Sequence, residues 1–238
     1  MLNRRSLIAG ATAFVAGSAR AQPHVLTAPV EIAVRAYPIA HFKVGDAAQT
    51  RFGRCVFRGG LELSSPHDAF GGLSGVAMDL DGGGFLAVSD VGSWFQTRLR
   101  YEGQRPAALT DCMIAPILNA DGVPLKRTRS FDTESLCIED GVAYVGVERV
   151  NDVLRFDWAK DKFAARGRPI QVPAAFKSLP HNRGCECLAV APRRSPLAGS
   201  LIAISERSGS RNEPTKGFIL TGAQRGEFQL VLKDEFDA

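Results

Sequence analysis

The chain has 238 residues, of which 45% are hydrophobic and 23% are charged, a composition that excludes a collagen, a coiled-coil rod and a wholly disordered chain. Its 24 glycines and 13 prolines indicate many turns. The formal net charge of +4 falls to +1 when the three arginines of the first 21 residues are set aside. The rest of the chain therefore has no basic excess that would indicate a nucleic-acid partner.

Residues 1–21 have the features of an export signal. Arg4-Arg5 precedes a small, apolar run, and Ala19-Arg20-Ala21 is a small-x-small cleavage site. The run is too short and too weakly apolar to span a membrane. The segment Asn-Arg-Arg-Ser-Leu-Ile favours the twin-arginine route, with the general secretory route as the alternative. We therefore expect a mature chain of residues 22–238 that has no integral membrane segment and is periplasmic or secreted.

Three segments of the mature chain share one plan, in which a short apolar strand, a turn with glycine and a second strand ending in an acid follow one another. They span residues 72–90, 133–149 and 184–207. Aligning them superimposes Ser74 on Glu134 and Glu186, at spacings of 60 and 52 residues. Further pairs of strand-like runs lie between and after the segments. Each period therefore holds about four strands, which is typical of a propeller blade.

No amphipathic helix of ten or more residues follows the leader, which favours an all-β fold. At this period the mature chain holds about four blades, and a ring of blades must close to hide its sheet edges. We predict one β-propeller domain of four-stranded blades over residues 22–238. It is either a compact four-bladed ring or, as we favour, an incomplete, C-terminally truncated six-bladed ring.

The cysteines match no zinc-binding spacing, and their odd number leaves at least one unpaired. We favour small buried residues, and a disulfide formed after export is the alternative. The five are Cys55, Cys112, Cys137, Cys185 and Cys187.

Five acids occupy corresponding points of the three hairpins, namely Asp90, Glu134, Glu148, Glu186 and Glu206. In a propeller the inner strands surround a central channel, so these acids would gather near one mouth of it. Grouped carboxylates repel one another, and a hard cation such as Ca²⁺, which takes six to eight oxygen ligands, relieves that repulsion. We predict these acids as metal ligands, and structural acids that hold turns are the alternative. A bound cation would polarise a phosphate for attack by water.

Three arginines lie beside these acids, namely Arg149, Arg183 and Arg207. A guanidinium suits bidentate binding of phosphate, and it equally suits pairing with the nearby glutamates. We predict these arginines as ligands of a small anionic substrate. Glu134, Glu186 and His181 are the candidate catalytic residues, because each could exchange a proton with a substrate.

The chain resembles the phytase-like domain family, also called the esterase-like activity of phytase family, in three ordered motifs. These are Gly72-Leu-Ser-Gly…Ala-Val-Ser-Asp90, then Asp132-x-Glu-Ser-Leu…Val-Glu-Arg149, then Pro180-His-Asn-Arg-Gly-x-Glu-x-Leu-Ala…Ile-Ser-Glu206. The resemblance covers about residues 45–235 and implies an exported bacterial six-bladed propeller, distantly related to calcium-dependent propeller phytases. Ser135 and Cys187 stand where the family usually has glycine, and the family continues with further blades beyond Leu232.

Three interpretations of function follow. The first is a periplasmic, calcium-dependent hydrolase of a phosphoester or related ester, which the resemblance and the acids favour. The second is a propeller that binds a ligand without turnover, because a fold does not determine a function. The third is a degenerate fragment with neither role. Gly72-Leu-Ser74-Gly-Val76 lacks the last glycine of a nucleophile elbow, which disfavours a serine hydrolase.

Overall fold

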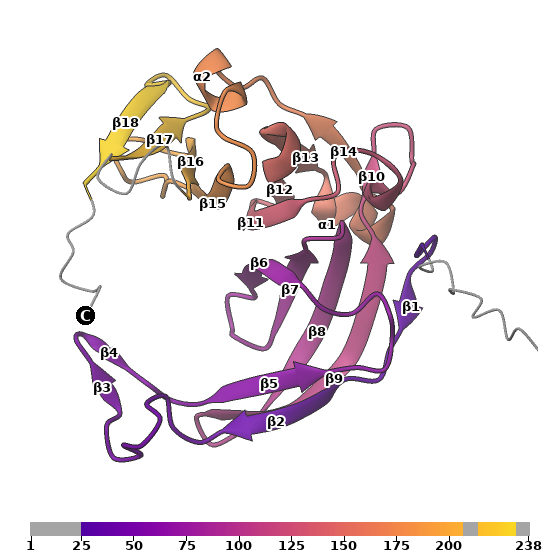
Figure 1. Cartoon of the computed structure of the whole chain (residues 1–238), viewed down its shortest axis with the longest axis vertical. Coiled ribbons are helices and arrows are strands. Elements are labelled where there is room, and N and C mark those ends of the chain that lie inside the picture. Colours follow the sequence, from indigo (N-terminus) through magenta and orange to yellow (C-terminus); the bar gives the residue numbers. More distant parts are fainter. Residues whose placement is uncertain (1–24, 207–213, 232–238) are drawn as a thin grey trace, which may run out of the picture.

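A computed structural model describes residues 25–206 and 214–231, whose regular secondary structure is almost entirely β-strand (Figure 1). The predicted export signal lies outside the described residues. Within the described segments, no helix has the length and hydropathy needed to cross a membrane. The helical pieces are short and lie between strands: η1 (Leu125–Arg127), η2 (Glu148–Val150), α1 (Trp158–Asp161), η3 (Lys162–Ala164) and α2 (Ala174–Lys177).

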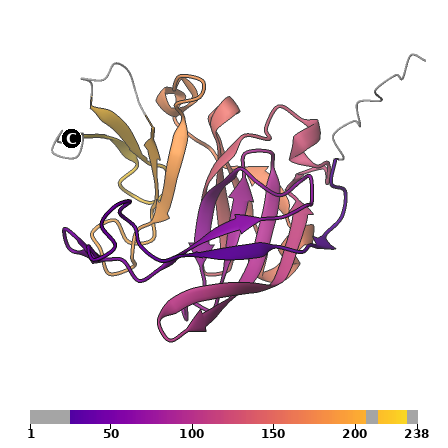
Figure 2. The same ribbon diagram turned by 60° about the horizontal axis from the view of Figure 1, so that its bottom comes forward.

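The first large sheet has five antiparallel strands in the order β1-β9-β8-β7-β6. Its strands are β1 (Val30–Glu31), β6 (Leu73–Met78), β7 (Gly84–Ser89), β8 (Ser93–Glu102) and β9 (Arg105–Pro116). The turn at Glu102-Gly103 joins β8 to β9, and Gly103 has the positive φ of 62° that such a turn uses. The β8–β9 hairpin reaches beyond the rest of its sheet (Figure 2).

The second and third sheets continue the chain in order. The second has the order β10-β14-β13-β12-β11, with β10 parallel to β14 and the other pairs antiparallel. Its strands are β10 (Leu118–Asn119), β11 (Thr133–Glu139), β12 (Val142–Val147), β13 (Asp152–Phe156) and β14 (Arg166–Pro169). The third is antiparallel, and its strands in order are β15 (Cys185–Val190), β16 (Leu201–Ser205), β17 (Thr215–Ile219) and β18 (Gly226–Leu230). The three predicted hairpins are confirmed as β6–β7, β11–β12 and β15–β16.

The described residues form three sheets of blade size, where the repeat length predicts about four. The strand-like residues before the first hairpin pair differently from a blade. β2 (Arg35–Ile39) pairs with β5 (Gly60–Ser64), and β3 (Arg51–Phe52) pairs with β4 (Cys55–Val56). β1 instead extends the first large sheet beside β9. This stretch therefore supplies two ribbons and one edge strand in place of a fourth blade.

The three large sheets follow one another around an arc, with β11 lying between β6 and β15 (Figure 1). Buried aromatic side chains join the first sheet to the second. Trp94 packs edge-on against Phe156, with ring centres 5.2 Å apart, and also contacts Trp158. Phe176 and Phe218 pack in the core between the second and third sheets. Buried aromatic contacts of this size dominate core energetics, so they set how the inner strands lie relative to one another.

The cysteines divide into two groups. Cys112 and Cys185 are buried and Cys137 is half-buried, in agreement with the interpretation as small core residues. Burial raises the pKa of Cys137 and of Cys185 to about 12, so both thiols stay protonated at neutral pH. Cys55 and Cys187 are exposed, so the prediction of burial is wrong for these two.

Candidate metal site

The same backbone hydrogen bond closes each of the three repeated hairpins. In each hairpin, the acid that follows the second strand donates its backbone N–H to the carbonyl oxygen of the residue directly before the inner strand. The bonds are Asp90 to Gly72 (2.9 Å), Glu148 to Asp132 (2.8 Å) and Glu206 to Gly184 (2.9 Å). The predicted acids Asp90, Glu148 and Glu206 therefore occupy equivalent places in the three sheets.

Each inner strand also carries a pairing irregularity at the repeated position. The register shifts between Leu73 and Val76 on β6, between Thr133 and Ser135 on β11, and between Cys185 and Cys187 on β15. The unpaired residue is Glu134 on β11 and Glu186 on β15. A bulge of this kind re-aims a side chain away from the regular alternation of the strand. The local backbone therefore explains how both glutamates reach the cluster described next.

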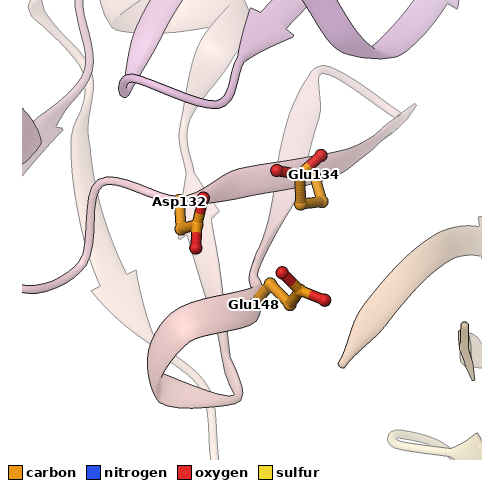
Figure 3. Close-up of side chains that lie close together, drawn as sticks. All are labelled: Asp132, Glu134 and Glu148. Atoms are coloured by element: carbon orange, nitrogen blue, oxygen red, sulfur yellow. The ribbon is translucent and has the colours of Figure 1, made fainter. Parts of the chain in front are cut away.

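Two groups of three carboxylates share Glu148. Asp132, Glu134 and Glu148 each offer an oxygen, and these oxygens all lie within 4.8 Å of one another (Figure 3). Glu148, Glu186 and Glu206 form the second group by the same measure. The groups join the second sheet to the third. The structure therefore brings together four of the five acids predicted as metal ligands.

Asp90 is the fifth predicted ligand, and it lies at the edge of this cluster. Partial burial raises the pKa of its carboxyl, and the charge of Asp132 raises it further, while Lys126 and the backbone N–H of Val91 lower it. Gly72 has a φ of 56°, and a Cβ added there would overlap Oδ1 of Asp90. Only glycine fits this position without moving the carboxylate.

Glu148 is the best-fixed acid of the cluster because it is buried and its carboxylate accepts a backbone hydrogen bond. Its side chain is only 6% exposed, and Oε1 accepts a 2.9 Å hydrogen bond from the backbone N–H of Gly184. A Cβ on Gly184 would lie 2.9 Å from Cγ of Glu148, so glycine permits this close approach. Asn151, at the end of η2, has a left-handed φ of 46° and donates from Nδ2 to the carbonyl of Leu179 at 2.7 Å.

The carboxylates of the cluster repel one another. The pKa of Glu186 is raised from 4.5 to about 7. The largest cause is partial burial, and the charges of Glu134, Glu148 and Glu206 and a hydrogen bond with Glu148 raise it further. The pKa of Glu134 is raised in the same way, first by burial and then by neighbouring acids, although a hydrogen bond from Ser74 lowers it. None of the ion pairs between described residues reaches these acids. A set of oxygen donors without a partner cation fits a hard divalent cation.

Of the other predicted site residues, Arg149 lies in η2, and His181 and Arg183 lie between α2 and β15. The guanidinium of Arg149 sits 5.0 Å from the ring centre of Phe131, beside Asp132 in the chain. His181 is exposed, and its Nδ1 lies 3.2 Å from the carbonyl oxygen of Arg149. Arg183 is exposed, and Arg207 lies outside the described residues. In the described part of the chain, no ion pair joins Arg149 or Arg183 to a glutamate.

Asp132 is the site residue that sequence reasoning missed. The positions equivalent to it in the other two hairpins are Gly72 and Gly184, so alignment of the repeats does not mark it as an acid position. Its signal is the Asp132-x-Glu134 spacing. Residues two apart on an extended strand lie on the same face, so the sequence favours placing this pair together. In the structure Asp132 directly precedes β11, and Glu134 is the bulge residue.

Residues 68–231 match the family model described as phytase-like, esterase-like activity of phytase. The chain belongs to this family. The resemblance stated from the three motifs is thereby confirmed over most of the range on which it was based. No curated protein matches the chain.

One solved structure with some similarity is that of a candidate 6-phosphogluconolactonase from Bacteroides uniformis ATCC 8492. It is 12% identical to this phytase-like chain, with a TM-score of 0.36. The match covers 66% of this chain and 39% of that one, so the phytase-like chain spans well under half of that protein's length.

Proposed function

We propose that this phytase-like chain is a hydrolase of a phosphoester or related ester that uses a bound divalent cation, and that the cation is calcium. The observation that supports this proposal is the pair of carboxylate groups that share Glu148. They come from two sheets, they offer only oxygen, and they include a glutamate whose pKa is raised to about 7. Oxygen ligands are what calcium prefers in proteins.

The acids of the two groups would hold the cation, with Asp90 close by on the first sheet. A bound cation would neutralise charge on a phosphoryl or ester oxygen and so favour attack by water. The buried hydrogen bond from Gly184 leaves Oε1 of Glu148 fixed in position, so this carboxylate is held ready before a ligand arrives.

Glu186 is the group best suited to move a proton at this site. A general acid or base works best when its pKa lies near the working pH, and that of Glu186 is about 7. Glu134 also has a raised pKa, and we keep it and His181 as further candidates for proton transfer. Arg149, Arg183 and Arg207 are the proposed contacts for the negative charge of a small-molecule substrate.

We also infer that the three sheets belong to a larger, six-bladed propeller. β11 packs against β6 on one side and β15 on the other. β6 leaves apolar side chains uncovered, with Leu73 37% exposed, Val76 57% and Met78 50%. Apolar side chains grouped in this way favour a further sheet packed on β6. Residues 1–21 support export to the periplasm, which cell fractionation with and without this segment would test.

Assays of hydrolysis with matched variants would test the proposed function. Turnover of p-nitrophenyl phosphate and p-nitrophenyl acetate is measured with calcium and with a chelator, for the wild type and for Glu134→Gln, Glu186→Gln and Glu206→Gln. Glu62→Gln, an exposed glutamate on β5, is the control for loss of one charge. We expect calcium-dependent turnover that falls at least about tenfold in the three cluster variants and stays unchanged in the control.

Two other results would overturn the proposal. Equal turnover in the wild type and all three cluster variants would remove the site from catalysis. Calcium binding without turnover of any ester would instead make the chain a binding module. Binding is followed separately, through the rise in melting temperature that a ligand of the folded state produces.

A further inference from the structure

A second charged site lies on the outer strands of the second sheet, away from the acidic cluster. Arg155, on β13, stands directly opposite Arg168 on β14. Arg166 is two residues from Arg168 on β14. Because side chains two residues apart on a strand share a face, the three arginines lie on one face of the sheet. Asp157 directly follows the end of β13.

A hollow of about 260 Å³ opens beside this face. The three arginines line it together with Asp157, with Asp161 of α1 and with Ala164 of η3. Arg155 is bound to Asp157, with Nη1 2.8 Å from Oδ1. No ion pair between described residues involves Arg166 or Arg168. Two guanidinium groups at this hollow are therefore without a carboxylate partner in the described part of the chain.

Like charges placed directly opposite each other on neighbouring strands destabilise a sheet. The pairing of Arg155 with Arg168 therefore carries a cost, and Arg166 adds a third positive charge to the same face. The carboxylate of Asp157 offsets part of this charge through Arg155. Asp161 also lines the hollow, so three arginines and two aspartates leave a net charge of +1 that a bound anion would offset.

The backbone that carries these arginines is well supported. Gly167 lies between Arg166 and Arg168, and a Cβ added to it would lie 2.5 Å from Cζ of Phe156. β14 therefore rests directly on a fully buried ring. A Cβ added at Gly122 would lie 3.3 Å from Cζ of Arg166, so the guanidinium of Arg166 lies close against this turn glycine. Because the guanidinium is a planar, pre-organised fork, less side-chain entropy is lost for each hydrogen bond that it forms with a ligand.

We propose that this arginine hollow, formed by Arg155, Arg166 and Arg168, binds the phosphoryl group of a small molecule. Planar guanidinium groups bind the oxygens of a phosphoryl group in bidentate fashion, and three arginines line this hollow. The site needs no metal and is separate from the carboxylate cluster. It does not rest on the proposed hydrolase function.

Calorimetric titration at low ionic strength, with EDTA present, tests the site. The probes are inorganic phosphate and phenyl phosphate, which distinguish a free anion from a phosphomonoester. We expect the wild type to bind at least one of them with a dissociation constant on the order of 1 mM. The double variant Arg166→Gln/Arg168→Gln should bind at least about tenfold more weakly. Asp157→Asn should bind about threefold more tightly, because Arg155 is then released toward the ligand.

Two controls separate this site from a general effect of charge. Arg35→Gln/Arg100→Gln removes the same number of exposed charges from other strands and should bind as the wild type does. Glu62→Gln, which removes an exposed acid on β5, should also bind unchanged. Equal binding by the Arg166→Gln/Arg168→Gln variant, or an equal loss in the Arg35→Gln/Arg100→Gln control, would overturn the proposal, as would no binding by the wild type. If circular dichroism shows that the double variant is unfolded, Arg168→Gln and Asp157→Asn give the same test singly.

Discussion

Oε1 of Glu148 accepts a 2.9 Å hydrogen bond from the backbone N–H of Gly184, and this bond joins the second sheet to the start of the third. The same carboxylate belongs to both groups of acids in the candidate metal site. The buried side chain of Glu148 therefore has two roles. It accepts the hydrogen bond of the Gly184 N–H, and it places a negative charge where the inner strands of the two sheets meet.

Two substitutions of Glu148 should separate the effect of the hydrogen bond from the effect of the charge. In Glu148→Ala the buried N–H of Gly184 loses its acceptor, which costs about 1–3 kcal/mol of unfolding free energy. Glu148→Gln keeps an acceptor oxygen and removes a repelling charge, so without metal its stability should stay close to that of the wild type. Urea unfolding in the presence of EDTA measures both. Equal losses in the two variants would show that the hydrogen bond contributes nothing.

Stability without metal should fall as the pH rises from about 4.5 to about 7. The pKa of Glu186 is about 7 in the folded chain and near 4.5 when unfolded, so between these values the folded state binds more protons. The unfolding free energy then decreases with pH. The raised pKa values of Glu134 and Asp90 act in the same direction. Urea unfolding at several pH values in EDTA should show a shallower slope for Glu186→Gln than for Glu62→Gln, and identical slopes would contradict this.

Asp132 should matter for metal binding although it lies outside the repeated acid positions. We expect Asp132→Asn to weaken calcium binding about tenfold, because the cluster loses one charged carboxylate ligand. A tenfold change corresponds to about 1.4 kcal/mol of binding free energy. Asp121→Asn is the matched control, since Asp121 lies in an exposed turn. Calorimetric titration with calcium measures both variants. A loss of the same size in the control would exclude a specific role for Asp132.

Gly72 should tolerate alanine poorly, and more poorly than Gly45 does. Both have a positive φ, of 56° and 82°, so both substitutions carry the backbone strain of a left-handed residue, about 1 kcal/mol or more. At Gly45 the added Cβ meets nothing within 4 Å, whereas at Gly72 it overlaps the carboxylate of Asp90. Urea unfolding measures the loss of unfolding free energy in Gly72→Ala and in Gly45→Ala. The difference between the two losses reports the contact with Asp90. Losses of equal size would mean that Asp90 moves aside freely.

Much of the local structure follows from the sequence because it depends on near neighbours. Alternating apolar residues and turn glycines are enough to predict the hairpins β6–β7, β11–β12 and β15–β16. The repeat also places Glu134, Glu148, Glu186 and Glu206 at hairpin ends. These features depend on residues within about twenty positions of one another in the chain. The alternation of exposed and buried residues along a strand, which repeats every two residues, is visible in the sequence.

Only the tertiary structure decides which strands and acids meet. The residues before the first hairpin have the pattern of strands, yet β1 pairs with β9 and β2 with β5, because those partners are selected by long-range packing. Glu186 and Glu206, at the strand ends of the third sheet, meet Glu148 of the second because the two sheets pack against each other. Asp90, at the end of a strand of the first sheet, lies outside both groups. Packing between sheets brings together residues that are far apart in the chain, and no local sequence pattern encodes which of them meet.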